Sequence, residues 1–141
     1  SKGRLLLPSS FKEQLGDALE EGFVLRPSLY DKCLELFGMS DWRAMQNKLG
    51  KLNPFKQENV MLIRRFNAGA RMVKVDASGR LQIPKDLMEK GGLVKEVVMT
   101  ALTDRMQIWD KTLSEQENER FSEADLAKAL SEKLGANDFI D

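Results

Sequence analysis

The chain has 141 residues, which is enough for one ordinary domain or for two small domains that share a core. Its 22 basic and 22 acidic side chains give a formal net charge of zero, and it has one cysteine and no histidine. These counts exclude Ser-His-Asp and Cys-His catalysis, imidazole metal ligands and an internal disulfide framework. We therefore expect no enzyme, no cofactor and no metal, and the single thiol fits a reducing cytoplasm. Because no run of about 18 apolar residues occurs, we expect no membrane span.

Hydrophobic periodicity predicts short strands and helices in the first half of the chain. The expected elements are, in order, an apolar strand over 4–7, a short amphipathic segment over 9–16, apolar runs over 23–25 and 33–37, and helices over 40–49 and 54–66. Cys33 opens the second apolar run, so we expect it in the core rather than acting as a nucleophile.

The second half begins with a predicted hairpin. Its strands cover 71–76 and 80–83, with Val73 and Val75 on one face and a turn at 77–79 in which Gly79 supplies a positive φ. The later elements are, in order, a short helix after Pro84, a hairpin of strands over 96–102 and 105–109, a helix opened by a capping box over 122–125 with Leu126, Leu130 and Leu134 on one stripe, and a fraying tail over 135–141.

The two halves repeat one pattern. Lys2-Gly3-Arg4-Leu5-Leu6-Leu7-Pro8 matches Ser78-Gly79-Arg80-Leu81-Gln82-Ile83-Pro84 at an offset of 76, and the elements that follow come in the same order. The repeat predicts two units, over 1–70 and 71–141, in an α+β fold whose short strands need the other copy to bury them. It also places the equivalent of Asp76 just before Ser1, so we expect an acidic residue and a strand there in the parent protein.

Charge is distributed unevenly along the chain. Basic residues outnumber acidic ones by 13 to 8 through residue 75, the counts are equal over 76–109, and acidic residues outnumber basic ones by 9 to 4 over 110–141. The densest basic stretch runs from Arg64 to Lys85. A local cationic face could therefore meet an anionic partner, although solvated surface charge is the simpler interpretation for any one residue.

The strongest motif is Asp76-Ala77-Ser78-Gly79-Arg80, with a partial twin in Ser1-Lys2-Gly3-Arg4. Two interpretations remain open. Asp76 and Arg80 could simply brace the turn, or the two copies could present Arg4 and Arg80 together on one surface. Arginine suits phosphates and guanine edges because its planar fork donates two parallel hydrogen bonds. Further phosphate contacts would come from Lys2, Arg71, Lys74 and Lys85, although Lys74 could equally be an ordinary outward-facing strand residue.

The doubled motif, together with Met106-Gln107-Ile108-Trp109-Asp110, resembles the MraZ family over essentially the whole chain. The resemblance implies two tandem units of an AbrB-like swapped-hairpin DNA-binding fold, which form an intrachain pseudo-dimeric β-barrel with flanking helices. It also implies a cytoplasmic, nucleoid-associated transcriptional regulator of the division and cell-wall gene cluster, assembled as a homo-oligomeric ring on tandem repeats in double-stranded promoter DNA. The residues expected at the DNA are Lys2, Gly3, Arg4, Arg71, Lys74, Asp76, Ser78, Gly79 and Arg80.

Two other classes of function remain. An antitoxin-like or assembly module of the same fold would act through protein contacts, and the acidic 110–141 segment favours it. A small enzyme that uses carboxylates would need a deep pocket lined by Asp and Glu, and neither a glycine-rich phosphate loop nor a cluster of metal ligands occurs in the sequence. We expect no small-molecule substrate.

Overall fold

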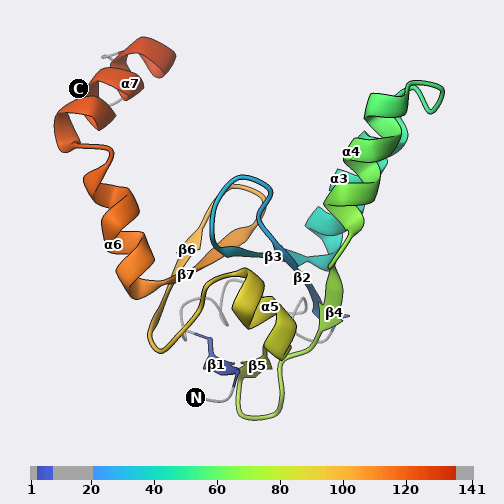
Figure 1. Cartoon of the computed structure of the whole chain (residues 1–141), viewed down its shortest axis with the longest axis horizontal. Coiled ribbons are helices and arrows are strands. Elements are labelled where there is room, and N and C mark those ends of the chain that lie inside the picture. The colour runs from blue at the N-terminus through green and yellow to red at the C-terminus, as the bar shows by residue number, and fades with distance from the viewer. Residues whose placement is uncertain (1–2, 8–20, 136–141) are drawn as a thin grey trace. The chain divides into compact units, whose positions relative to one another are not determined.

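The computed structural model describes residues 3–7 and 21–135, and the predicted segment over 9–16 and most of the predicted tail lie outside these ranges (Figure 1). The chain divides into two compact units, which meet in sequence between Asp110 and Lys111. The described elements of the first unit are β1 (Arg4–Leu6), β2 (Phe23–Pro27), β3 (Leu34–Gly38), α3 (Met39–Gly50), α4 (Gln57–Asn67), β4 (Arg71–Val73), β5 (Arg80–Gln82), α5 (Lys85–Lys90), β6 (Val97–Ala101) and β7 (Met106–Asp110). The second unit contains α6 (Lys111–Glu119) and α7 (Glu123–Leu134).

The strands form two antiparallel sheets, which confirms the α+β class. One sheet has five strands in the order β4-β2-β3-β7-β6, and the other contains only β1 and β5. Neither sheet closes into a barrel within the described residues. In the same ranges, none of the helices has both the length and the apolarity that crossing a membrane requires.

Strands from the two copies of the repeat pair with each other. β1 pairs with β5, β2 with β4, and β3 with β7. The registers of two of these pairs are symmetric. In β1–β5, Arg4 lies opposite Gln82 and Leu6 opposite Arg80, so a shift of 76 residues exchanges the two pairs and leaves Leu5–Leu81 at the centre.

The β3–β7 pair has the same property. Leu34 lies opposite Ile108 and Leu36 opposite Met106, so a shift of 72 residues exchanges these two pairs. Glu35 and Gln107 lie opposite each other at the centre. Both cross-copy pairs are therefore related by a local two-fold axis, as expected if two equivalent units face each other.

The main core lies between the two sheets and α5. It is formed by buried side chains from both copies, namely Phe23, Leu25, Leu34, Leu36, Val73, Leu81, Ile83, Leu87, Leu93, Met106 and Ile108. Leu5, Val75 and Met88 pack against this cluster. Neither copy supplies the whole cluster, so burial of the short strands depends on both.

A second cluster fixes α3 and α4 on the other face of the sheet. Phe37 and Phe66 are buried there, and the Trp42 ring stacks on Phe66 at 5.6 Å between centroids. The side chains of Gln46 and Asn67 hydrogen-bond to each other across the helix pair. The predicted helices over 40–49 and 54–66 are therefore confirmed, although the second begins only at Gln57.

The predicted hairpin over 71–76 and 80–83 is wrong in its pairing. The turn forms, but its arms separate after a single bridge between Val75 and Leu81. β4 pairs instead with β2, and β5 pairs with β1. Alternating apolar residues specify which face of a strand is buried, but they do not specify which strand lies beside it.

Two other local predictions are confirmed. The second hairpin forms between β6 and β7, within one residue of the predicted strands. At the start of α7 the Ser122 hydroxyl accepts the Asp125 backbone N–H, and the Asp125 carboxylate accepts the Ser122 backbone N–H. This reciprocal pair is the capping box that the sequence predicted.

We expect Gly3→Ala to destabilise the first unit by about 1–3 kcal/mol. Gly3 has a φ of +81°, and an added Cβ would lie 2.6 Å from the Ile83 carbonyl oxygen. Gly50→Ala is the matched control, because Gly50 lies in α3 and its added Cβ would meet no atom within 4 Å. It should leave stability unchanged or raise it slightly. Urea unfolding followed by fluorescence measures both, and equal midpoints for the two variants would contradict the prediction.

Candidate nucleic-acid interface

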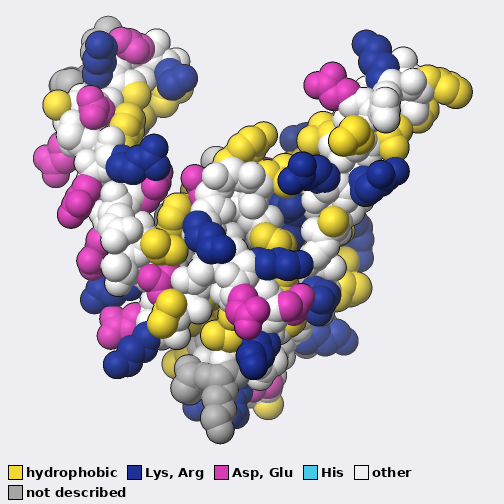
Figure 2. Space-filling model, in the orientation of Figure 1, with side chains coloured by type: hydrophobic (Ala, Val, Ile, Leu, Met, Phe, Trp, Pro, Cys, Tyr) yellow, Lys and Arg dark blue, Asp and Glu magenta, His cyan; other side chains and the backbone are white. Residues whose placement is uncertain are grey.

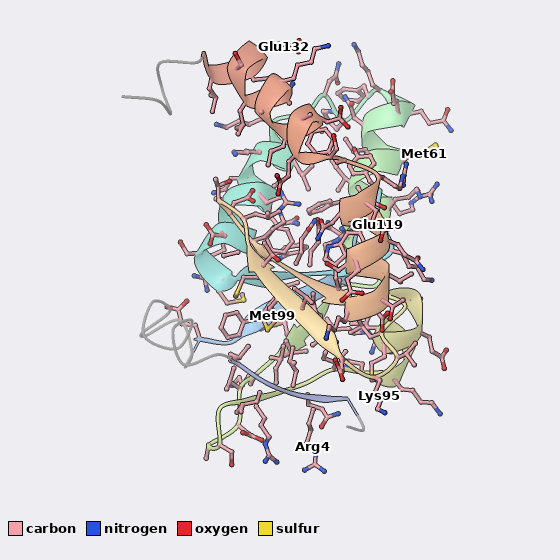
Figure 3. The ribbon with its side chains drawn as sticks, turned by 90° about the vertical axis from the view of Figure 1, so that its left-hand side faces the viewer. Arg4, Met61, Lys95, Met99, Glu119 and Glu132 are labelled. Atoms are coloured by element: carbon pink, nitrogen blue, oxygen red, sulfur yellow. The ribbon has the colours of Figure 1, made fainter. Side chains whose placement is uncertain are left out.

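The outer face of β1 and β5 presents two arginines. Because strand residues alternate between faces, Leu5 and Leu81 point into the core while Arg4, Leu6, Arg80 and Gln82 share the opposite side, which we call the ribbon face. All four side chains are exposed. Arg4 lies opposite Gln82, two residues from Arg80, so the arginines are diagonal neighbours on the order of 7–8 Å apart. In Figure 3 the Arg4 side chain extends away from the five-stranded sheet.

A tight turn positions Arg80. One oxygen of the Asp76 carboxylate accepts backbone N–H groups from both Ser78 and Arg80, each at 2.9 Å. The Asp76 N–H donates to the Arg80 carbonyl, and Gly79 adopts a φ of 80°. Within the described residues, no ion pair joins the Asp76 carboxylate to the Arg80 guanidinium. Asp76 therefore braces the turn through the backbone and leaves the Arg80 side chain outside that network.

The corresponding part of the first copy has the same geometry. Gly3 has a φ of 81°, matching 80° at Gly79. The Leu7 N–H donates to the Gly79 carbonyl, and the Ile83 N–H donates to the Gly3 carbonyl. These two hydrogen bonds exchange under the shift of 76 residues, so Arg4 and Arg80 occupy equivalent places on the ribbon face.

The other predicted contacts lie apart from the ribbon face or outside the described residues. Arg71 is in β4, in the other sheet, and its guanidinium forms a 2.6 Å ion pair with Asp86 of α5. Lys74 is exposed just beyond β4, and Ser78 is exposed in the turn. Lys2 lies outside the described residues. The structure thus brings Gly3, Arg4 and the 76–80 turn together but does not bring Arg71 to them.

A cavity of about 260 Å³ lies beside β1, between α5 and β6. Its lining is apolar, from Leu5, Ile83, Met88 and Val97 among others, with Arg4 and Lys95 as its charged members. No Asp or Glu lines it. Nor do the described residues contain a group of His, Cys, Asp or Glu able to hold a metal ion. The acidic pocket that a carboxylate enzyme would need is therefore absent from this cavity.

Comparison with known proteins decides the family. A family model described as "MraZ protein, putative antitoxin-like" matches residues 66–137. A protein named transcriptional regulator MraZ, from Christiangramia forsetii, is 42% identical over 139 residues, which cover 99% of this chain and 89% of the relative. Proteins of the same name from Flavobacterium psychrophilum and Caldicellulosiruptor bescii are 44% and 38% identical and cover 96% and 94% of this chain and 85% and 90% of those relatives. The chain belongs to the MraZ family.

This MraZ-family chain also contains a buried charge network that the sequence did not reveal. Arg26 is 1% exposed and Glu35 is 6% exposed. The Arg26 guanidinium donates to the Glu35 carboxylate at 3.1 Å and to the Phe66 carbonyl at 2.8 Å. Arg105 donates to the other Glu35 oxygen at 3.2 Å.

Aromatic rings and a second carboxylate complete the network. The Arg26 guanidinium lies over the Phe66 ring and that of Arg105 over the Phe37 ring, at 4.4 and 4.8 Å. Burial lowers the pKa of Arg26, and the Glu35 carboxylate partly offsets this. Hydrogen bonds to Asp104 raise the pKa of Arg105. Every charge is thus paired, and the network joins α4 to β2, β3 and the β6–β7 turn.

The network could have been suspected from one feature of the sequence. Arg26 directly follows the apolar run 23–25, and Glu35 lies inside the run 33–37. A charged residue at an inward position of a short buried strand needs a partner of opposite charge. Only the pairing of β2 with β3 shows that Arg26 and Glu35 lie opposite each other.

Cys33 is part of the core, as expected from the sequence. Its side chain is fully buried, and burial raises the pKa of the thiol to about 12. At neutral pH the group is therefore a thiol rather than a thiolate, and it is a poor nucleophile.

We expect Glu35→Gln to cost about 3–5 kcal/mol of stability, because it leaves the buried Arg26 guanidinium without its carboxylate. Asp86→Asn is the matched control. It makes the same chemical change at a carboxylate whose ion pair with Arg71 is exposed, so we expect a loss below about 1 kcal/mol. Urea unfolding monitored by circular dichroism compares the two. A loss at Glu35 no larger than that at Asp86 would mean that the network contributes little.

Proposed function

We propose that this chain regulates transcription by binding double-stranded promoter DNA through the ribbon face. The observation that carries the proposal is the exposed pair Arg4 and Arg80, diagonal to each other on a two-stranded antiparallel ribbon. A two-stranded ribbon fits into the major groove of B-DNA, where an arginine can donate two hydrogen bonds to the guanine O6 and N7 atoms. The names of the relatives, transcriptional regulators, agree with this role.

The remaining candidate residues supply the parts of the interface that do not read bases. Lys2, Lys74 and Arg71 contact phosphates, Arg71 after exchanging Asp86 for the DNA backbone. Asp76, Ser78, Gly79 and Gly3 set the turns that aim the two arginines. Phosphate contacts release counterions, so the affinity falls steeply with salt. No bond is made or broken, and the function requires neither a cofactor nor a small-molecule substrate.

We further propose that residues 1–70 and 71–141 are two copies of an AbrB-like unit and form an intrachain pseudo-dimeric barrel. The support is that β1–β5 and β3–β7 pair across the copies with two-fold symmetric registers. The boundary between the copies differs from the boundary between the compact units at Asp110, because strands of one copy pack on strands of the other.

One ribbon face covers few base pairs, so tight binding requires several chains on one DNA. We propose a homo-oligomeric ring bound to tandem repeats in the promoter of the division and cell-wall gene cluster, in the cytoplasm at the nucleoid. Linked chains raise the effective concentration of each ribbon face at the next repeat. Direct repeats suit a head-to-tail assembly, and an assembly that covers the promoter represses it.

We expect Arg80→Ala to weaken binding to the repeat DNA by roughly 10- to 100-fold, which corresponds to about 1–3 kcal/mol for a base contact. Arg80→Lys should keep the salt dependence but lose discrimination at one base pair, because lysine lacks the planar fork. Arg120→Ala is the control, since it removes an equal charge from the exposed end of the second unit. Fluorescence anisotropy at two salt concentrations, with a duplex carrying the promoter repeats, measures all three. Unchanged affinity and salt slope for a folded Arg80→Ala would refute the role of Arg80.

A second candidate function is an antitoxin-like or assembly module that acts through protein contacts. The description of the matching family model as antitoxin-like, and the acidic excess over 110–141, favour it. It predicts a stoichiometric protein partner and no salt-sensitive DNA binding, so the same anisotropy titration separates the two functions.

A further inference from the structure

Two helix pairs follow equivalent strands in the two copies. α3 and α4 come after β3, while α6 and α7 come after β7, the strand to which β3 is related by the local two-fold axis. In each copy the first helix begins directly where the strand ends. By the logic of a repeat, the two pairs should carry similar surfaces, but they do not.

The two helix pairs carry opposite charge. From Met39 to Asn67 there are six basic and two acidic side chains, whereas from Lys111 to Asp141 there are four basic and eight acidic ones. Figure 2 shows dark blue side chains along α3 and α4 and magenta ones along α6 and α7. Arg64 and Arg65 on α4 are exposed and form no ion pair with any described residue, and the same holds for Glu115 and Glu119 on α6.

Both helix pairs also expose large apolar side chains. On α4 these are Val60, Met61 and Leu62, which are 38%, 48% and 41% exposed. In the second unit Phe121, Leu126 and Leu134 are 52%, 47% and 53% exposed. Leu126 and Leu134 belong to the α7 stripe that the sequence predicted to pack against a partner. Apolar groups that stand in water beside unpaired charges are typical of a protein interface.

We propose that the α3–α4 pair of one chain docks on the α6–α7 pair of a second copy, head to tail. This inference rests on the proposed assembly and names the surfaces that would form it. Opposite charges attract across such an interface, whereas two α3–α4 pairs, or two α6–α7 pairs, would repel each other. The contact is therefore heterologous, and repeating it generates a closed ring when the rotation between chains closes.

A second copy explains these surfaces better than DNA does. DNA would attract the basic α3–α4 pair but not the acidic α6–α7 pair, and it offers no apolar partner for Met61 or Val60 outside the bases. A second copy satisfies both helix pairs at once. The ribbon face, which lies on other elements, stays available for DNA.

Cross-linking between different chains tests the contact directly. Met61→Cys on α4 and Leu126→Cys on α7 are made in separate chains, one carrying a size tag, and the mixture is treated with a short bismaleimide. Cys33 provides a silent background because it is buried and protonated. We expect a mixed product at least tenfold above either homodimer product. Tyr30→Cys mixed with Leu126→Cys is the control, since Tyr30 is 91% exposed but lies outside both helix pairs.

Three results would overturn the proposal. A mixed product no greater than the Tyr30 control would show that the two surfaces do not meet. A dominant Met61 homodimer would show an isologous contact. Cross-linking of Met61→Cys and Leu126→Cys only when both lie in one chain would show that the helix pairs meet within the chain.

Charge exchange tests the cause of the contact. In sedimentation velocity, Arg64→Glu with Arg65→Glu, and separately Glu115→Lys with Glu119→Lys, should each raise the concentration needed for assembly at least tenfold. An equimolar mixture should assemble again, because each altered surface then meets its complement. Assembly that both variants retain, or that mixing does not restore, would overturn the proposal.

The same variants separate this inference from the proposed function. The Arg64/Arg65 variant should bind a duplex with one repeat as the unaltered chain does and should lose only the added affinity for tandem repeats. Weaker binding to one repeat with unchanged assembly would assign α4 to DNA and overturn the inference while leaving the ribbon face in place. Arg80→Ala should assemble normally, so a failure of DNA binding there concerns the proposed function alone.

Discussion

Strand pairing between the two copies of the repeat is the constraint on which the rest of the structure depends. β1, β4 and β5 each have three residues, which is too short for a stable hairpin or sheet of their own. Each becomes part of a core only by pairing with a strand from the other copy. The ribbon face is a direct consequence, because the β1–β5 pair that buries Leu5 and Leu81 must turn Arg4 and Arg80 outward on one side.

The two interpretations of the Asp76 motif are therefore compatible rather than exclusive. The carboxylate braces the turn by accepting two backbone N–H groups, and this is a structural role. Because the bond to the Arg80 N–H uses backbone atoms alone, the guanidinium is left to project from the ribbon face. A direct side-chain ion pair would have competed with any anionic ligand for the same group. Bracing through the backbone fixes the position of Arg80 without neutralising its charge.

Much of this organisation could be predicted from the sequence, because a repeat, a capping box and alternating strands are local patterns. The doubled Gly-Arg motif located Gly3 and Gly79, and both have the positive φ that the repeat implies. Strand partners could not be predicted in this way, since Val73, Val75 and Leu81 satisfy the same alternation in a hairpin or across copies. Pairing between distant strands depends on the whole core. For the same reason the partners of Arg26, at Glu35 and Phe66, became visible only in the folded chain.

The two copies differ most where symmetry no longer serves a shared surface. Arg26 and Glu35 lie opposite each other in the first copy, and the places that correspond to them in the second are held by Thr100 and Gln107. The first copy therefore holds its helix pair with a buried ionic network, since Arg26 donates to the Phe66 carbonyl of α4. The neutral pair of the second copy lacks that means of attachment, because Thr100 and Gln107 carry no charge to pair. A two-fold ribbon combined with unequal helix pairs is what a head-to-tail assembly on repeated DNA requires, since a fully symmetric chain would offer the same surface at both ends.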